Sequence, residues 1–131
     1  AGFIGSPAMN FVRGKVAGPD AGGTAVDLED GSRIVVPARP GAKAGDAVTV
    51  GVRPEHLSLG GTGEVRLSGT LDLVERLGET GYAYCRLDTG TPVTAEVRGA
   101  VALATGSRAG VSAAPENVHL FDAGGLALAP A

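Results

Sequence analysis

Short apolar runs, separated by glycine and proline, organise the first half of this chain. Residues 11–17, 24–28, 33–36 and 47–52 are rich in valine and predict β-strands. Asp30-Gly31 lies between the second and third runs and predicts a hairpin, because glycine adopts the positive φ that such turns require. The stretch from Gly18-Pro19-Asp20 to Gly23 predicts a turn after the first strand.

The second half repeats this pattern. Residues 65–74, 82–87 and 92–97 predict strands, with a turn at residues 78–81 between the first two. Asp88-Thr89-Gly90 predicts a second hairpin between the last two. After Phe121, the residues up to Ala131 are of low complexity and are expected to fray.

Aligned segments indicate an internal repeat. Residues 28–34 align with residues 87–93 at an offset of 59, and residues 45–55 align with residues 106–116 at an offset of 61. Gly14-Lys15-Val16 matches Gly69-Thr70-Leu71 if the second half carries a few extra residues. A glycine-rich chain also gives such matches by chance. The common order of turn, strand and Pro-Glu pair favours a duplicated β-unit, with halves at about residues 11–59 and 64–122.

Each half ends in a Pro-Glu pair. In Gly51-Val52-Arg53-Pro54-Glu55-His56-Leu57, proline suits the first helical position and glutamate suits the positive end of the helix dipole. Residues 115–121 are a looser copy. The chain is therefore predicted to be all-β, a small closed or partly open barrel of two related halves, with a single helical turn at one or both Pro-Glu pairs.

The amino-acid composition limits the kinds of function that this chain can have. The 131 residues are enough for one domain, and with 44% hydrophobic but only 4% aromatic residues the core must consist of small aliphatic side chains. A net charge of -3 with 11 basic residues gives no basic stripe for nucleic acid, although Tyr82 and Tyr84 could stack a base. The lone Cys85 and the lack of a bilayer-length apolar run favour a soluble, cytoplasmic domain.

Catalytic and metal-binding patterns are missing. His56 and His119 follow Glu55 and Glu116, but their spacing, with or without Cys85, is not that of zinc ligands. No G-x-S-x-G elbow is present. Residues 60–63 are glycine-rich but lack the Lys-Ser/Thr of a phosphate-binding P-loop, and residues 57–61 break the order of an ABC signature motif. We expect no catalytic residue, metal or cofactor in this chain.

Three stretches together carry a family resemblance: residues 3–11 (FIGSPAMNF), residues 51–57 (GVRPEHL) and residues 115–122 (PENVHLFD). In this order and spacing they resemble the C-terminal regulatory region, often called a TOBE domain, of carbohydrate-importer ABC ATPases of the maltose and glycerol-3-phosphate type. The resemblance covers Phe3 to Asp122 and implies an OB-fold-like β-barrel. Molybdate- and tungstate-importer ATPases use a related barrel for oxyanions, so oxyanion binding is the alternative function.

The resemblance also implies an organisation. Residues 1–9 would be a linker remnant from a missing ATPase domain, residues 10–124 the regulatory domain and residues 125–131 a flexible tail. The missing domain would bind ATP and magnesium and make the parent protein a transport ATPase. Two such subunits would lie beneath membrane permease subunits at the inner face of the cell membrane. Their regulatory domains would form a homodimer, and in some members of the family they also receive a regulatory protein; nucleic acid is not an expected partner.

The resemblance assigns two sets of residues. The candidate regulatory and dimer surface comprises Phe11, Gly45, Gly51, Gly69, Glu75 and Gly106. The family motif, with a structural role, comprises Arg53, Pro54, Glu55, His56, Pro115, Glu116 and His119. The glycines of the first set have a simpler interpretation as turn residues, and Glu75 as a solvated strand residue. The transported sugar is not encoded in this region.

Overall fold

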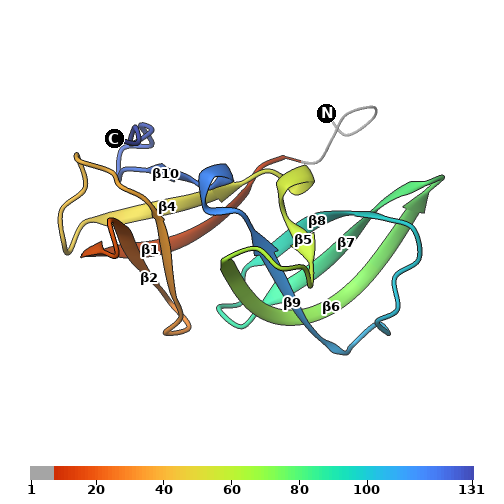
Figure 1. The fold of residues 1–131 in the computed structure, drawn as a ribbon. Helices are drawn as coiled ribbons and strands as arrows, with labels where there is room; N and C mark the ends of the chain where they lie inside the picture. The colour runs from red at the N-terminus through yellow and green to blue at the C-terminus, as the bar shows by residue number, and fades with distance from the viewer. Residues whose placement is uncertain (1–7) are drawn as a thin grey trace.

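The structure is a computed structural model that describes residues 8–131, so residues 1–7, most of the predicted linker remnant, lie outside the described part. The described residues form strands and two single 3-10 turns, as Figure 1 shows. The elements are β1 (Asn10–Asp20), β2 (Gly23–Leu28), β3 (Arg33–Pro37), β4 (Ala47–Val52), η1 (Pro54–His56), β5 (Ser58–Leu59), β6 (Val65–Leu77), β7 (Thr80–Leu87), β8 (Pro92–Arg98), β9 (Arg108–Ala113), η2 (Pro115–Asn117) and β10 (His119–Phe121).

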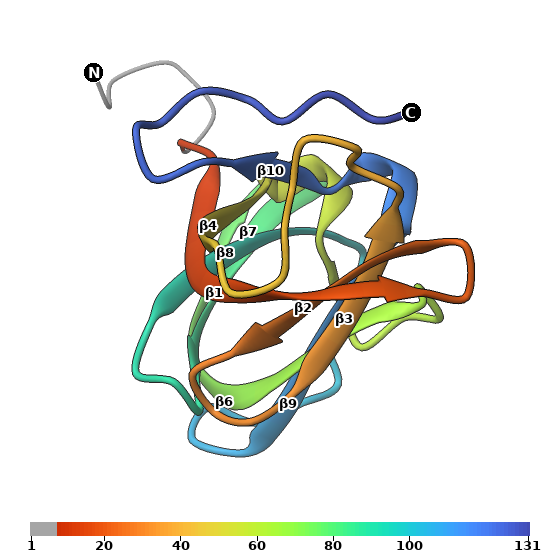
Figure 2. The ribbon, with the colours of Figure 1, turned by 90° about the vertical axis from the view of Figure 1, so that its left-hand side faces the viewer.

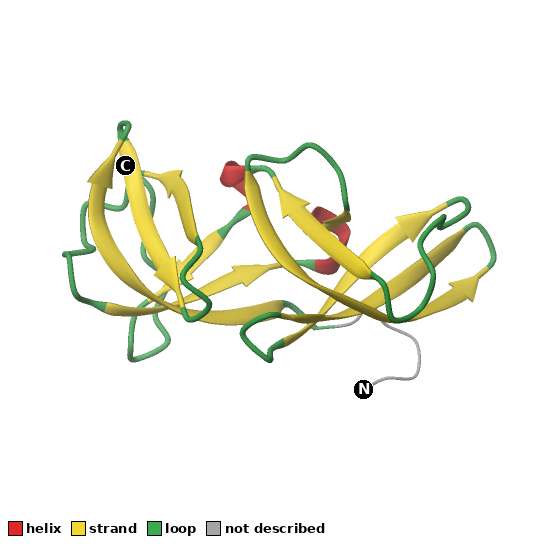
Figure 3. Cartoon of the chain, turned by 90° about the horizontal axis from the view of Figure 1, so that it is seen from below, coloured by secondary structure: helices red, strands yellow, loops and turns green. Residues whose placement is uncertain are grey.

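The strands form two curved antiparallel sheets that lie side by side (Figures 1 and 3). The first lobe is the sheet with strand order β10-β4-β1-β2-β3, and the second lobe is the sheet with order β5-β9-β6-β7-β8. The two orders correspond strand for strand. The prediction of an all-β fold with two related halves is confirmed, and most strands of each half lie in one of the two curved sheets.

The two halves of the sequence exchange their last strands. β5 belongs to the first half but pairs with β9 in the second lobe, where Leu59 lies opposite Val111. β10 belongs to the second half but pairs with β4 in the first lobe, where Leu120 lies opposite Val50. The 3-10 turns η1 and η2 carry the chain across between the lobes (Figure 1). Each lobe is therefore completed by the other half of the chain.

Backbone hydrogen bonds reproduce the repeat. Leu28 N donates to Ser32 O (2.9 Å), and at the offset of 59, Leu87 N donates to Thr91 O (2.8 Å). The central strands of the two lobes, β1 and β6, each have a register shift at the equivalent place. The shift lies between Val16 and Gly18 in β1 and between Leu71 and Leu73 in β6. The match at Gly14 and Gly69 is thus confirmed, because these glycines lie two residues before the start of each shift.

Small aliphatic side chains fill the interior, as composition predicts. Along most of each strand, buried and exposed residues alternate, which is the period of a sheet with one face in the core. The largest fully buried side chains are Leu71, Leu120, Val16, Val26, Val36, Val50, Val111 and Val118. They come from both halves of the chain, and Leu120 lies in the exchanged strand β10, so burial as well as pairing fixes the position of β10.

Two predicted turns are wrong in extent. Gly18, Pro19 and Asp20 belong to β1, because the register shift lets the strand continue, and the turn is confined to Ala21 and Gly22. Likewise Thr80 and Gly81 belong to β7, and only Gly78 and Glu79 form the turn. A register shift absorbs an extra residue without ending the ladder. The consequence is a longer hairpin, β6–β7, than the sequence predicts.

The C-terminal residues turn back over the first lobe (Figure 2). Leu128 N donates to Leu120 O (2.8 Å), and Ala131 N donates to Ala38 O (2.8 Å). Phe121 and Ala127 also form an isolated β-bridge. The flexibility predicted for residues 125–131 stays a prediction, but the structure gives these residues a surface on which to lie.

Candidate interaction surfaces

The Pro-Glu motifs form the crossings between the lobes. Pro54 is buried, whereas Glu55 and His56 are exposed, and no side chain caps η1 at Arg53. In η2, Glu116 is also exposed and Pro115 is half-buried. In both turns the backbone N–H after the turn bonds back to the proline carbonyl, at Leu57 and at Val118. The structural role that the resemblance implies for the whole motif stays a prediction.

An aromatic surface lies on the first lobe. Phe11 and Phe121 meet edge to face with ring centroids 5.9 Å apart, and His119 lies 6.4 Å from Phe121. These three residues, over Gly51, are called the aromatic surface below. A Cβ on Gly51 would lie 2.8 Å from the Phe121 ring and 2.7 Å from Met9 Sδ, so glycine is what allows the rings to lie this close to β4. Phe11 remains 53% exposed although it packs against Phe121.

A second apolar surface lies on the hairpin β6–β7. Leu73, Glu75 and Leu77 alternate along β6 and therefore share one face, opposite Tyr84, Tyr82 and Thr80 of β7. The leucines are 55% and 59% exposed, and the Tyr84 hydroxyl donates to Glu75 Oε1 (3.0 Å). Burial, and then the bond to Glu75, raises the pKa of Tyr84. The name hairpin surface is used below for five residues: Leu73, Glu75, Leu77, Tyr82 and Tyr84.

The structure brings only some of the predicted regulatory residues together. Phe11 and Gly51 are direct partners across β1 and β4 and lie in the first lobe. Glu75 lies on the hairpin surface of the second lobe. The backbone of Arg86 lies so close to Gly69 that a Cβ on Gly69 would be 2.3 Å from the Arg86 carbonyl oxygen.

Gly45 and Gly106 occupy equivalent turns. Their φ angles are +93° and +88°, which explains the need for glycine. Gly45 N donates to Val16 O (2.8 Å), and Gly106 N donates to Leu71 O (2.7 Å). Both glycines therefore have sufficient structural reasons for their identity, and a regulatory role for them stays a prediction.

Sequence reasoning missed Phe121, Leu73 and Leu77 as surface residues. Phe121 closes the second Pro-Glu motif, but only the exchange of β10 places it beside Phe11. The leucines fall in a strand where alternation predicts burial of every second residue. The register shift after Leu71 changes which face they occupy. No short-range signal in the sequence marks such a shift.

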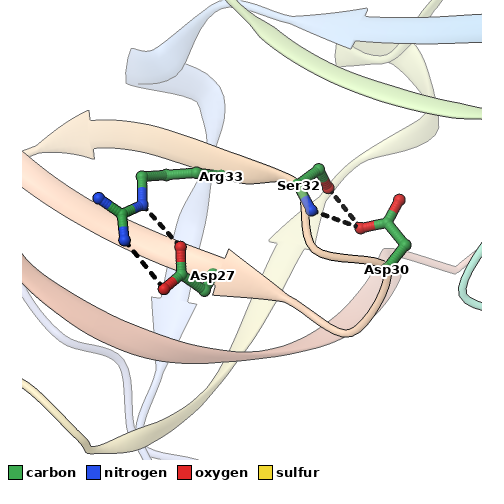
Figure 4. A network of polar contacts seen from close by, with 4 residues as sticks. All are labelled: Asp27, Asp30, Ser32 and Arg33. Atoms are coloured by element: carbon green, nitrogen blue, oxygen red, sulfur yellow. Dashed lines mark hydrogen bonds and ion pairs between the residues drawn. The ribbon is translucent and has the colours of Figure 1, made fainter.

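Some of the surface charges are held in local pairs. Arg33 Nε lies 2.6 Å from Asp27 Oδ1, and Ser32 donates to Asp30 through both its N–H and its hydroxyl (Figure 4). A second pair joins Arg108 to Asp88 at 2.6 Å. The hydrogen bonds from the arginines lower the pKa of both Asp27 and Asp88. Within residues 8–131, no group of three or more His, Cys, Asp or Glu side chains is arranged to hold a metal ion.

Cys85 lies inside the second lobe, where burial raises the pKa of its thiol. None of the described helical segments is long and apolar enough to cross a membrane. The described residues also line several open grooves of comparable size. One, of about 530 Å³, runs from Glu55 and Leu59 to Leu103, and another, of about 500 Å³, follows β3.

Comparison with known sequences finds proteins of one kind. The lactose transport ATP-binding protein LacK of Rhizobium radiobacter is 41% identical over 99 residues, which are 73% of this chain and 27% of LacK. The sn-glycerol-3-phosphate import ATP-binding protein UgpC of Ruegeria sp. (strain TM1040) is 41% identical over 123 residues, 93% of this chain and 32% of UgpC. The chain thus spans about a third of the length of these relatives.

Among solved structures, the cytoplasmic molybdate-binding protein ModG, in a form with molybdate bound, has the same fold. Its TM-score is 0.74 at 22% identity, over 90% of this chain and 97% of ModG. The family models for the TOBE domain and for the MalK OB fold domain match residues 50–121 and residues 5–57. The chain belongs to the TOBE domain family, with an OB fold of the MalK type in its first half.

Proposed function

We propose that this chain is the non-catalytic regulatory and dimerisation domain of the ATP-binding subunit of a sugar ABC importer. The observation that carries the proposal is the alignment with LacK and UgpC, which covers 73% and 93% of this chain but only 27% and 32% of those proteins. Both relatives are named as transport or import ATP-binding proteins. The remaining two thirds of such a protein would bind ATP and magnesium and hydrolyse ATP.

The aromatic surface supports a self-contact. Phe11 is 53% exposed and lies beside Phe121, and aromatic side chains are enriched in protein interfaces. The hairpin surface adds two exposed leucines around Glu75. A homodimer that buries one or both surfaces would hold two subunits together while their ATPase domains move. The same surfaces could receive a regulatory protein.

The expected setting follows from the relatives. An import ATP-binding protein works with permease subunits in the membrane, so this domain would lie at the cytoplasmic face of the transporter. The relatives differ in substrate, lactose for LacK and sn-glycerol-3-phosphate for UgpC. The proposal therefore names only a class of transported solute, sugars and related compounds, and no single solute.

Sedimentation equilibrium of the 131-residue chain, from micromolar to millimolar concentration, tests the dimerisation proposal. We expect a reversible dimer. A monomer at every concentration would remove self-contact from the functions of this domain.

Oxyanion binding is the alternative function, because the fold is that of ModG, whose structure holds molybdate. Calorimetric titration with tungstate separates the two functions. The regulatory proposal predicts no heat of binding, and saturable binding would favour an oxyanion store or sensor. In residues 8–131, Arg33 and Arg108 are already paired with carboxylates, which leaves fewer free cations for an oxyanion.

A further inference from the structure

The free edge of β8 in the second lobe is extended by a side chain. The carboxamide of Asn10 accepts a hydrogen bond from Thr94 N (2.7 Å) and donates one to Thr94 O (2.8 Å). It also donates to Val52 O (3.1 Å), which fixes its orientation. An amide group from outside the sheet therefore pairs with this edge as a residue of another strand would.

Val35 occupies the equivalent position at the edge of β3. Ala25 lies opposite Val35, just as Tyr84 lies opposite Thr94, and Val35 precedes Thr94 by the repeat offset of 59. The hairpin before β3 is closed by the bond from Leu28 N to Ser32 O, and the hairpin before β8 by the equivalent bond from Leu87 N to Thr91 O. Hydrogen-bonded and non-hydrogen-bonded pairs therefore alternate at the same positions in the two hairpins. Because the N–H and C=O of Thr94 face away from β7, those of Val35 face away from β2.

The group that pairs with this edge in the second lobe is missing in the first. Asn10 pairs with Val52 at the start of β1, and its counterpart at the start of β6 is Val65, which pairs with Ala113. Val65 is buried and apolar and cannot form a hydrogen bond through its side chain. Within residues 8–131, the main chain of Val35 has no hydrogen bond to a side chain or to an element outside its sheet.

An open groove runs along this edge. It has a volume of about 500 Å³ and is lined by β3, by residues 21–23 at the turn from β1 to β2, and by Glu64 and Pro115. Glu64 is exposed and forms no ion pair within residues 8–131, whereas Arg33 is neutralised by Asp27. The unpaired charge beside the groove is thus negative, which favours a basic group in whatever lies there.

We propose that the outer edge of β3 binds an extended peptide segment of a partner protein. The C=O and N–H of one residue of the segment pair with the N–H and C=O of Val35, as the Asn10 carboxamide pairs with Thr94, and a lysine or arginine of the segment lies toward Glu64. This is strand addition, in which main-chain bonds supply affinity. Pro37 lacks an N–H and limits the ladder to a few bonds, so the contact is weak. The site is separate from the aromatic and hairpin surfaces and goes beyond the proposed function.

Amide hydrogen exchange of the free chain tests the open edge first. We expect the Val35 amide to exchange quickly and the Thr94 amide to be protected by Asn10. In the Asn10→Ala variant, Thr94 should lose its protection, with Val35 unchanged. Equal protection of Val35 and Thr94 in the dilute chain would show that the edge is already occupied and would overturn the proposal.

Titration with a peptide tests the occupant. The probe is a short, acetylated and amidated peptide of alternating valine and threonine, with one central asparagine and one terminal lysine. We expect saturable shifts of the Arg33 and Val35 amide signals in nitrogen–proton spectra. Val35→Pro, which removes the edge N–H, should weaken binding about tenfold, the effect of one hydrogen bond. Val35→Thr keeps the N–H and is the matched control, with affinity within about twofold of the parent chain.

Two further changes keep the test independent of folding. Glu64→Gln should weaken binding of the lysine peptide and leave binding of a peptide that has glutamine in place of the lysine unchanged. N-methylation of the peptide amides should abolish the shifts without altering the protein. Shifts spread over other surfaces, or none at millimolar peptide, would overturn the proposal. Protection of Val35 that grows with protein concentration would instead assign the edge to a second copy of the chain, which also overturns it.

Discussion

Arg39 Nη2 donates a hydrogen bond of 2.9 Å to the carbonyl oxygen of Val118, the residue that follows η2. Arg39 follows β3 in the first half, and Val118 precedes the exchanged strand β10 in the second half. Arg39 is only 6% exposed, its Nη1 donates to Pro37 O (2.5 Å), and no carboxylate is paired with it among the described residues. The buried guanidinium therefore serves to hold the crossing of the second half in place.

Replacing Arg39 should destabilise the fold. Arg39→Ala leaves the Val118 carbonyl buried without its donor, which costs about 1–3 kcal/mol in the free energy of unfolding. The matched control is Arg98→Ala, because Arg98 is the residue at the repeat offset of 59, and its side chain is 79% exposed. That change should stay within about 0.5 kcal/mol. Urea unfolding measures both, and equal losses would contradict a special role for Arg39.

The close backbone approach at Gly69 in β6 gives a second prediction. In Gly69→Ala, the new Cβ would lie 2.3 Å from the Arg86 carbonyl oxygen, a backbone atom that cannot move aside locally. We expect a loss of about 1–3 kcal/mol or more, as for an overpacked core. Gly110→Ala is the control on the neighbouring strand, since its nearest heavy atom would be 3.7 Å away. Thermal unfolding should place Gly110→Ala at or slightly above the parent chain, because alanine reduces the entropy of the unfolded state.

Local patterns predicted the parts of this fold that local chemistry controls. Both hairpins lie at Gly31 and Gly90, whose φ angles are +88° and +90°, and β4 has the predicted bounds of residues 47–52. The repeat was visible because each half needs the same glycines and the same Pro-Glu pair. These features depend on a few neighbouring residues only.

The features that the sequence did not predict depend on pairing between residues far apart in the chain. β5 has two residues and β10 has three, too few for a periodic pattern, and the sequence halves gave no sign that the two strands change places. The partnership of Asn10 with Thr94 spans 84 residues. It became recognisable only when the start of β1 was placed beside the edge of β8. The same reason explains why the aromatic surface escaped prediction, although Phe11 and His119 had each been singled out.

The exchanged strand gives a third prediction. Leu120 is 1% exposed and lies opposite Val50, so Leu120→Ala should cost about 2–5 kcal/mol. Hydrogen exchange should then rise first in β4, in the first lobe, although Leu120 belongs to the second half of the sequence. Leu126→Ala, at a 72% exposed position of the tail, is the control and should change little. Faster exchange confined to the second lobe would contradict the exchange of strands.

The surface ion pairs give a prediction on pH. The hydrogen bond from Arg33 lowers the pKa of Asp27 in the folded chain, and Arg108 does the same for Asp88. A lowered pKa means that each pair stabilises the fold above the pKa of an unfolded aspartate, and that this stabilisation is lost as the pH falls below about 4. In a carboxyl NMR titration, Arg33→Gln should raise the pKa of Asp27 and leave that of Asp88 unchanged. A joint shift of both would show that the pairs are coupled.

The aromatic surface gives the last prediction, which rests on self-association of the chain. Phe11 is 53% exposed in the monomer and would be buried in a dimer that uses this surface, and aromatic residues at the centre of an interface often contribute 2 kcal/mol or more, so about tenfold or more in affinity. Phe11→Ser should therefore weaken the dimer by at least about tenfold in sedimentation equilibrium.

Leu126→Ser removes an even more exposed apolar side chain from the tail and controls for general surface hydrophobicity. Glu75→Lys tests the hairpin surface in the same way. If Glu75→Lys weakens the dimer and Phe11→Ser does not, the contact lies on the hairpin surface. An unchanged dimer in both variants would remove both surfaces from the interface, because each substitution alters the residue that its surface presents to a partner.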